Sequence, residues 1–493
     1  MFPSRAELGI ISVTTNFVRA LLVNPNRMKP AVAPIGLDYL ADSILEAGHQ
    51  ARLMDLCFEE SPLEALESSV QRTAPDVIAL TIRNTDDCYY ASHAFFLPEI
   101  RRLVAHLRQW STAPIVLGGI GFSIAPQAIL QYCGADYGIA GDGEVAFATL
   151  LDALERQEPL DHIPGLSYSQ NGLVRSNPAH CIDLTTLPPR QRAFIDNRRY
   201  FAEGGQGGFE TKRGCSMPCC YCADPIAKGR TIRAMPPARV VDELQRLLEQ
   251  GVDHLHTCDS EFNLPSEHAL AVCEQIARTG LGNRIRWYAY CSPVPFSDSL
   301  AVAFKRAGCA GINFGVDSGS NAMLARLGRH FRVADLERTA AICRHHHIPF
   351  MFDLLVGGPG ETLATLAETI DRMKRIGPDC VGFALGVRLY PGTPLTNQVR
   401  AERTAVQGLA KPDTSLTDSD MLEPVFYVSP ALGPHPFATA RSLIAGDQRF
   451  FLPTAADTNQ GYNYNDNQPL VQAIRRGARG AYWDILRQLR PPQ

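Results

Sequence analysis

The chain has 493 residues, a formal net charge of -4, and charged side chains at 20% of its positions. This length predicts two or three domains with enough interior to enclose large cofactors. Acidic and basic residues are mixed along the chain, which argues against a nucleic-acid partner, and no apolar stretch is long enough to span a membrane, so we expect a cytoplasmic protein without membrane partners.

Residues 17–150 alternate apolar runs with amphipathic segments, which is typical of parallel strands joined by helices. The pattern predicts a helix over residues 34–48 and strands over residues 17–24, 51–56, 77–82 and 115–117. These elements predict an α/β fold that begins with a doubly wound, Rossmann-like domain. We place this domain and its linker in residues 1–190.

Small or polar residues follow four strands of this predicted domain, at the edge where ligands of doubly wound sheets bind. They are Asn24 and Pro25, then Thr81, Ile82, Arg83 and Asn84, then Gly118, Gly119, Ile120, Gly121, Phe122 and Ser123, and finally Gly141, Asp142, Gly143 and Glu144. A connector rich in proline and asparagine follows over residues 159–199, with a predicted hinge at residues 187–190.

A second series of alternating strands and helices is predicted over residues 205–396. Its strands are expected at residues 209–212, 254–258, 286–290, 311–316, 350–355 and 381–388. Six such strands predict a partial (β/α)6 barrel.

The alternation of strands and helices disappears beyond residue 396, so we expect a small C-terminal cap over residues 397–493. It would contain a final amphipathic helix at residues 470–489, and a segment at residues 462–467 that forms either a lid over the barrel mouth or a surface loop.

Four of the fourteen cysteines fall within eight residues, as Cys215, Cys219, Cys220 and Cys222. Cys215, Cys219 and Cys222 form a C-x3-C-x2-C motif directly after a predicted strand. Such a motif can supply three thiolates to a four-iron, four-sulfur cluster and leave one iron without a protein ligand. A zinc site is disfavoured because the chain offers no second ligand pair, and buried structural thiols are disfavoured by the irregular, polar flanks of the loop.

This cysteine spacing, with Tyr221 before the third cysteine, resembles the signature of the radical S-adenosylmethionine (SAM) superfamily, and the resemblance extends through the predicted barrel. It implies that the open iron chelates the amino and carboxylate groups of SAM, whose sulfonium is cleaved by one electron from the cluster. Asp259 is the first candidate to replace the family's Gly-Gly-Glu in holding the SAM amino group, and Glu261 beside it is a further candidate cofactor contact. Asp317 and Ser318 fall in a sequence similar to the family's G-x-E-S-G, which implies contact with the ribose or methionine part of SAM.

The glycine-rich strand ends of the first domain resemble the cobalamin-binding domain of the cobalamin-dependent radical SAM class. The resemblance implies that Gly118, Gly119, Gly121, Phe122, Ser123, Gly141, Gly143 and Glu144 contact the cobalamin. The D-x-H-x-x-G motif is absent, so no histidine from it would reach the cobalt, and Thr81, Arg83 and Asn84 are expected to face the lower side of the corrin. The alternative is an empty domain kept for packing or partner docking.

The cofactor pair implied by this resemblance favours an enzyme that resembles the class B radical SAM methylases. We expect it to transfer a methyl group to an unactivated carbon, or to phosphorus, of a small natural-product intermediate. One SAM would remethylate the cobalamin and a second would form the radical, with a reducing partner such as flavodoxin or ferredoxin. Three alternatives stay open: cyclisation or rearrangement without methylation, transfer of the aminocarboxypropyl group of SAM to an acceptor such as arsenic, and a non-catalytic cobalamin sensor.

Other polar or reactive residues are expected to be structural. His345, His346 and His347 end a predicted helix and are interpreted as a solvated turn rather than a metal site. Cys258 and Cys291 follow predicted barrel strands and are interpreted as small buried hydrophobic residues.

Overall fold

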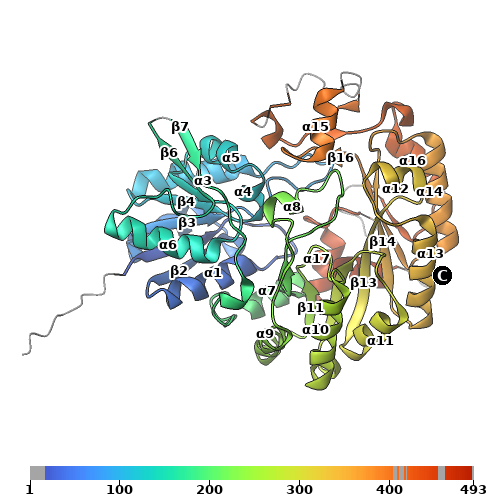
Figure 1. Cartoon of the computed structure of the whole chain (residues 1–493), viewed down its shortest axis with the longest axis horizontal. Coiled ribbons are helices and arrows are strands. Elements are labelled where there is room, and N and C mark those ends of the chain that lie inside the picture. The colour runs from blue at the N-terminus through green and yellow to red at the C-terminus, as the bar shows by residue number, and fades with distance from the viewer. Residues whose placement is uncertain are drawn as a thin grey trace, which may run out of the picture.

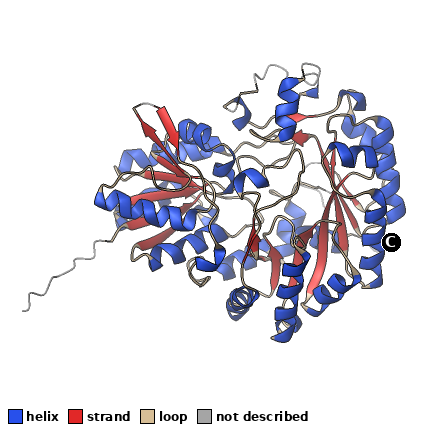
Figure 2. Cartoon of the chain, viewed as in Figure 1, coloured by secondary structure: helices blue, strands red, loops and turns tan. Residues whose placement is uncertain are grey.

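The computed structural model describes residues 17–171, 173–402, 408–409, 416–417, 419–452 and 461–490. They form two α/β lobes that lie side by side, each built on a twisted sheet with helices outside it (Figures 1 and 2). Within these residues, no helix has the length and apolar character that crossing a membrane requires.

The N-terminal lobe contains a seven-stranded sheet of order β2-β1-β3-β4-β5-β6-β7. Strands β1 to β5 are parallel, as predicted, and place their carboxyl ends at one edge. All four predicted strands of this lobe are confirmed, each within two residues of the expected ends. The bounds are β1 Arg19–Asn24, β2 Gln50–Asp55, β3 Val77–Thr81, β4 Ile115–Gly118, β5 Tyr137–Ile139, β6 Leu166–Gln170 and β7 Leu173–Ser176.

Helices cover both faces of this sheet, as the alternation along each strand requires. In β1, Leu21 and Val23 pack with α2, α3 and α5, whereas Ala20 and Leu22 pack with α1 and α6 on the opposite face. The predicted helix at residues 34–48 is confirmed as α1. The bounds are α1 Ile35–Glu46, α2 Pro62–Thr73, α3 Leu97–Trp110, α4 Ile120–Ile124, α5 Pro126–Cys133 and α6 Gly143–Arg156.

The predicted connector is partly wrong, because residues 166–176 are not a linker. They form the β6–β7 hairpin, which extends the sheet in antiparallel fashion. Asn171 begins the turn with a φ of 54°, and the Asn-Gly pair at this point is a strong hairpin signal that the polar character of the segment obscured. The hinge expected at residues 187–190 stays a prediction, and Arg190 at its end forms ion pairs of 2.9 Å with Glu210 and Glu243 of the second lobe.

The second lobe contains a sheet of seven parallel strands in the order β18-β15-β14-β13-β12-β11-β8. The six predicted strands are present, so the partial barrel is confirmed. Cap residues add a seventh, β18, which is too short to give a periodic signal. The bounds are β8 Gly207–Phe209, β11 His254–Thr257, β12 Arg286–Cys291, β13 Cys309–Asp317, β14 Phe350–Val356, β15 Cys380–Leu385 and β18 Phe450–Phe451.

Two predicted barrel strands are each divided in the structure. Residues 209–212 contain the end of β8 and the start of β9 (Lys212–Arg213), which pairs with β10 (Arg233–Ala234) instead of the barrel. Residues 381–388 contain most of β15 and then β16 (Val387–Arg388), which pairs with β17 (Phe426–Tyr427). The paired segments β9 and β16 therefore lead out of the barrel into the loops at its mouth.

Helices pack against the outer face of the barrel through one large apolar core. The predicted final helix at residues 470–489 is wrong as one element, because Gly477 and Gly480, with φ of 102° and 126°, interrupt it. The bounds are α7 Asn197–Gly204, α8 Asp224–Ala227, α9 Pro237–Glu249, α10 Ser266–Arg278, α11 Asp298–Arg306, α12 Asn321–Arg326, α13 Val333–His345, α14 Leu363–Ile376, α15 Pro394–Ala401, α16 Pro436–Ile444, α17 Gln468–Arg475 and α18 Tyr482–Gln488.

A buried network of charged side chains joins the two lobes. Arg192, which is fully buried, donates from Nε to Asp38 Oδ2 of α1 over 2.8 Å and from Nη1 to Glu243 Oε1 of α9 over 2.7 Å. Tyr39 of α1 donates its hydroxyl to the same Glu243 oxygen over 2.6 Å. Breaking such pairs leaves uncompensated buried charge, so the network fixes how the lobes face each other.

Candidate cofactor and active site

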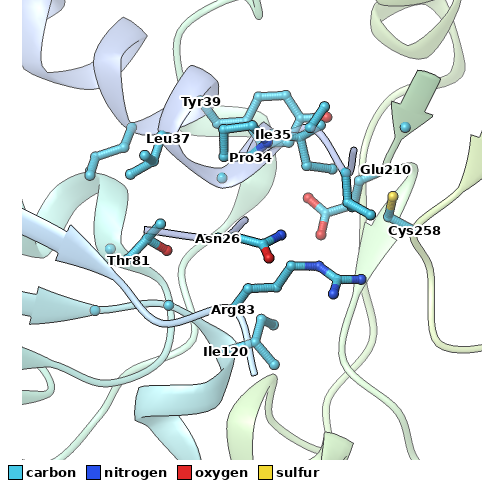
Figure 3. A pocket seen from close by; sticks show the side chains of 18 of the residues that line it. Asn26, Pro34, Ile35, Leu37, Tyr39, Thr81, Arg83, Ile120, Glu210 and Cys258 are labelled. Carbon is cyan, nitrogen blue, oxygen red and sulfur yellow. The ribbon is translucent and has the colours of Figure 1, made fainter. Parts of the chain in front are cut away.

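A cavity of about 650 Å³ lies between the two lobes. One wall consists of α1 and the carboxyl ends of β3, β4 and β5, and the opposite wall consists of β8, the end of β11 and Tyr482 of α18. Figure 3 shows side chains from both walls pointing into this space. Eight of the predicted cobalamin contacts line it: Thr81, Arg83, Asn84, Gly118, Gly119, Gly141, Gly143 and Glu144.

Three predicted contacts, Gly121, Phe122 and Ser123, do not line the cavity but lie behind its wall. Phe122 is fully buried in the apolar core beside β4. Ser123 donates its hydroxyl to the Gly119 carbonyl over 2.9 Å and accepts from the Gly141 amide over 2.9 Å. It thereby links the glycine turn after β4 to the glycine turn after β5.

The glycines of the cavity wall serve two different needs. Gly119 has a φ of 98°, and a Cβ there would lie 2.6 Å from the Ile82 carbonyl oxygen, so this turn requires glycine for its own backbone. Beside Gly118 and Gly143, by contrast, the nearest atoms to an added Cβ are 3.8 and 3.9 Å away. The latter two keep the wall flat where a bound ring system would approach.

Arg83 extends across the cavity towards Cys258 and Glu210 of the second lobe (Figure 3). It makes no ion pair with a carboxylate of the described residues, and enclosure by protein lowers its pKa. Burial also raises the pKa of Cys258 to about 12, so this thiol is neutral. Cys258 thus lines the cavity, contrary to its interpretation as a core residue, whereas Cys291 is buried in the barrel core as expected.

Glu144 connects the cavity wall to the strand that precedes the cysteine loop. Its Oε1 accepts from Nη2 of Arg213 over 2.6 Å, and Arg213 Nη1 also donates to Asp142 over 3.0 Å. Burial alone would raise the pKa of Glu144, but the charge and hydrogen bonds of Arg213, with a backbone hydrogen bond and the charge of Arg190, together hold that pKa below its ordinary value. Glu144 is therefore an ionised anchor between the lobes.

The cysteine loop runs from β9 to α8, beside the cavity. Burial raises the pKa of the Cys215, Cys219 and Cys222 thiols, and the two other thiols add to the effect at Cys222. Cys220 differs, because its thiol donates to the Arg326 carbonyl oxygen over 3.6 Å and its amide to the Leu327 carbonyl oxygen over 3.0 Å. The loop thus presents three cysteines and turns the fourth towards α12.

The spacing of the three thiols does not suit a single zinc ion, whose ligand sulfurs would lie about 3.8 Å apart. Across the described residues, one group of three or more potential metal-ligand atoms lies within 4.8 Å of one another, and it is Asp298, His345 and His346 rather than the cysteines. The larger iron–sulfur cluster does not require its ligand sulfurs to lie this close together. The imidazole ring centroids of His345 and His346 lie 4.8 Å apart at the end of α13.

Two predicted SAM-binding acids have different surroundings. Asp259 accepts from the Thr211 amide (2.8 Å), the Thr211 hydroxyl (2.5 Å) and the Lys212 amide (3.2 Å), so its carboxylate already secures the strand before the cysteine loop. Glu261 has an oxygen, Oε2, without any hydrogen-bond partner. Burial raises the pKa of Glu261 to about 8 against the opposing charge of Arg329.

Asp317 lies at the end of β13, with a φ of 62° that aims it at the cysteine loop. Its Oδ2 accepts from the Tyr221 hydroxyl over 2.7 Å and lies 3.4 Å from Nε of Arg329. Arg329 also donates from Nη1 to Cys219 Sγ over 2.9 Å. No sequence motif indicated Arg329, whereas Ser318 turns away and contacts the Thr369 hydroxyl at 3.0 Å.

A second polar group, also missed by sequence analysis, lies inside the barrel. Asp353 of β14 accepts from the Tyr462 hydroxyl at Oδ1 (2.6 Å) and from Asn313 Nδ2 at Oδ2 (2.5 Å). Asn463 next to Tyr462 donates to Asp87 Oδ2 of the first lobe over 3.0 Å. Residues 462–467 are therefore inserted between barrel and first lobe, which supports a lid and contradicts a surface loop.

Comparison with known proteins identifies both lobes. The B12 binding domain family matches residues 26–151, and the Radical SAM superfamily matches residues 209–373. The chain is 30% identical to tryptophan 2-C-methyltransferase of Streptomyces laurentii over 94% of both proteins. It is 26% identical to an uncharacterized methyltransferase of Pyrococcus horikoshii, over 73% of this chain and 77% of that protein.

A solved structure of a radical SAM methyltransferase from Kitasatospora setae, with tryptophan substrate and a SAM analogue bound, has the same fold. It matches with a TM-score of 0.87 and 31% identity, over 95% of this chain and 97% of that chain. Another structure of that methyltransferase holds cobalamin and a four-iron, four-sulfur cluster.

Proposed function

Since the chain belongs to the cobalamin-dependent radical SAM methyltransferases, we propose that it transfers a methyl group to a carbon atom of a small aromatic natural-product intermediate. Tryptophan is the first acceptor to test, because two similar proteins are named for it or hold it. The observation that carries the proposal is the match over almost the whole length of both chains. The family resemblance predicted from the cysteine spacing is thereby confirmed.

The cavity between the lobes fits cobalamin. It offers a flat glycine wall at Gly118 and Gly143 and the side chains of Thr81, Arg83 and Asn84 at the end of β3. Among the described residues of this first-lobe wall there is no histidine and no cysteine. We therefore propose that the first lobe holds the corrin through backbone and side chains such as Thr81, Arg83 and Asn84, without supplying a histidine or a cysteine to the cobalt.

The cysteine loop fits a four-iron, four-sulfur cluster held by Cys215, Cys219 and Cys222. When bound, cobalamin supplies a methyl carrier, and the cluster with SAM supplies the methyl source and one-electron chemistry. Glu261, rather than the fully engaged Asp259, is proposed to hold the SAM amino group, because its Oε2 has no hydrogen-bond partner and a cationic amino group would favour the charged form that burial disfavours. Asp317 lies on the same side of the loop and is proposed to orient the remainder of SAM.

Methylation is distinguished from its alternatives by following the methyl group. Anaerobically reconstituted protein, given cobalamin, a reductant, SAM labelled in its methyl carbon and tryptophan, is expected to form a product that carries the label. An unlabelled rearranged product, or one carrying the aminocarboxypropyl group, would contradict the proposal. Failure to consume SAM would favour a cobalamin sensor instead. The matched control is the Cys215→Ala/Cys219→Ala/Cys222→Ala protein, which should form no product.

A further inference from the structure

The barrel contains a half-buried carboxylate, Asp353, that has no cationic partner among the described residues. Asp353 occupies the lumen side of β14, because Met351 two residues earlier packs with Tyr288 and Trp483 at the closed end of the barrel. Its neighbours Phe352 and Leu354 face the outer helices instead. Asp353 therefore lies one layer above the apolar plug that closes the barrel.

The surroundings of Asp353 supply hydrogen bonds but no positive charge. It accepts from the Tyr462 hydroxyl and from Asn313 Nδ2, and no ion pair joins it to any arginine, lysine or histidine that the structure describes. Burial raises the pKa of Asp353 to about 6, and the negative charge of Asp317 adds to the effect. At neutral pH the carboxylate is ionised, and its partial removal from water costs free energy that a cationic ligand would offset.

Two polar atoms beside Asp353, Asn313 Oδ1 and the Tyr464 hydroxyl oxygen, have no hydrogen-bond partner. Because Asn313 donates its Nδ2 to Asp353, the carbonyl oxygen Oδ1 of its amide is fixed in place, and it is buried without a partner. The Tyr464 hydroxyl is likewise buried without a partner, and its ring lies 6.0 Å from that of Tyr462. An ammonium group has three donors and no acceptor, and aromatic faces attract it.

Gly382 of the neighbouring strand β15 makes room for the Asp353 carboxylate and the Tyr462 ring themselves. A Cβ at Gly382 of β15 would collide with Asp353 Oδ1 and with the ring of Tyr462. The lumen therefore keeps a glycine where any larger residue would displace the carboxylate or the lid tyrosine. The acceptors are thus arranged by β13, β14, β15 and the lid together.

We propose that Asp353 and the Oδ1 atom of Asn313 bind the protonated amino group of the methyl acceptor, so that the substrate is an amino acid or amine rather than a neutral or purely anionic metabolite. This inference rests on the proposed function, since it takes the barrel lumen as the acceptor site. Such a site would distinguish small aromatic molecules by whether they carry a positively charged amino group.

The test compares two acceptors that differ in the amine alone. Wild-type holoenzyme should methylate tryptophan with a KM on the order of 10- to 100-fold below that for indole-3-propionate, which lacks the amino group. The Asp353→Asn variant should raise the KM for tryptophan by a similar factor and leave the KM for indole-3-propionate unchanged. Its affinity for SAM, measured by equilibrium binding, should equal that of the wild type.

Two further variants guard against a merely structural effect. Asp484→Asn removes another carboxylate that accepts from a tyrosine hydroxyl, Tyr288 at 2.8 Å, at the closed end of the barrel. It should leave the ratio of the two KM values unchanged. Asn313→Ala keeps the Asp353 charge and removes one acceptor, so it should raise the KM for tryptophan by a smaller factor than Asp353→Asn does. It also replaces Asp353→Asn as the test variant if that protein does not fold.

Three outcomes would overturn the inference. Equal KM values for the two acceptors, both methylated by the wild type, would remove the amine site and leave the proposed function standing. Weaker SAM binding by Asp353→Asn with unchanged tryptophan KM would assign the carboxylate to SAM. Methylation of neither acceptor would overturn the proposed indole substrate and the amine site with it.

Discussion

The guanidinium of Arg329 donates a hydrogen bond from Nη1 to the sulfur of Cys219 over 2.9 Å, and its Nη2 donates to the Gly315 carbonyl oxygen. Arg329 is buried together with Asp317 and Glu261, which lie 3.4 and 3.8 Å from it. A positive charge thus lies against one proposed cluster ligand. Hydrogen bonds and charges at cluster sulfurs tune reduction potential.

Replacing Arg329 by Met should make the cluster harder to reduce. Loss of a charged hydrogen bond of about 1.5–3 kcal/mol corresponds to a shift of roughly 65–130 mV towards negative potential. The measurement is a redox titration followed by electron paramagnetic resonance, with iron content as a check on assembly. Arg326→Met is the matched control, since Arg326 is exposed on the neighbouring helix. An unchanged potential in a fully loaded Arg329→Met protein would contradict this role.

Among the four clustered cysteines, Cys220 should be dispensable. Its thiol donates to a backbone carbonyl at α12, so Cys220→Ala removes one weak bond and should retain the iron and sulfide content of the wild type. Single alanine variants of Cys215, Cys219 and Cys222 should each lose most of it. Chemical assay and visible absorbance after anaerobic reconstitution decide between these outcomes. Loss of the cluster from Cys220→Ala alone would identify a different ligand set.

Arg192→Met should strongly destabilise the protein. The substitution leaves Asp38 and Glu243 buried without their shared cation, which typically costs about 3–5 kcal/mol in free energy of unfolding. Arg156→Met is a control for arginine removal as such, because its ion pair with Asp152 is exposed and worth about 0–1 kcal/mol. Denaturant unfolding measures both. Similar losses for the two variants would show that the buried network does not hold the lobes together.

The stability of the cofactor-free protein should depend on pH through Asp353. Its native pKa of about 6 lies above its ordinary value, so the native state retains a proton that the unfolded state releases as pH rises from about 4. The native state therefore loses stability over this interval, by about 3 kcal/mol for a shift of roughly two units. Asp353→Asn lacks this loss, so its stability relative to wild type should increase from pH 4 to pH 7. A difference that stays constant with pH would contradict a raised pKa.

The sequence predicted the parts of the site that local patterns encode. The cysteine motif and the glycine-rich strand ends carry their own spacing, and both lie where parallel strands end. Arg329, Asn313 and Asp353 were missed because nothing in their immediate neighbours marks them. Asn313 meets Asp353 only when β13 and β14 pair, and Arg329 reaches Asp317 only when the loop after α12 packs against the end of β13.

The remaining errors have similar physical causes. β18 has two residues and depends on β15 for its existence, and the helix break at residues 476–481 reflects two glycines inside an otherwise amphipathic pattern. Asp259 and Glu261 are two residues apart, and their surroundings, rather than their sequence positions, decide which one has a free oxygen.

Tyr482 closes the inter-lobe cavity, although most of its other walls come from residues 24–147 and 206–259. A ribosome delivers these two groups of residues long before it delivers α18, and domains tend to fold in the order of their synthesis. The last helix of the described chain thus completes the wall of a cavity whose other lining residues are all synthesised before residue 260.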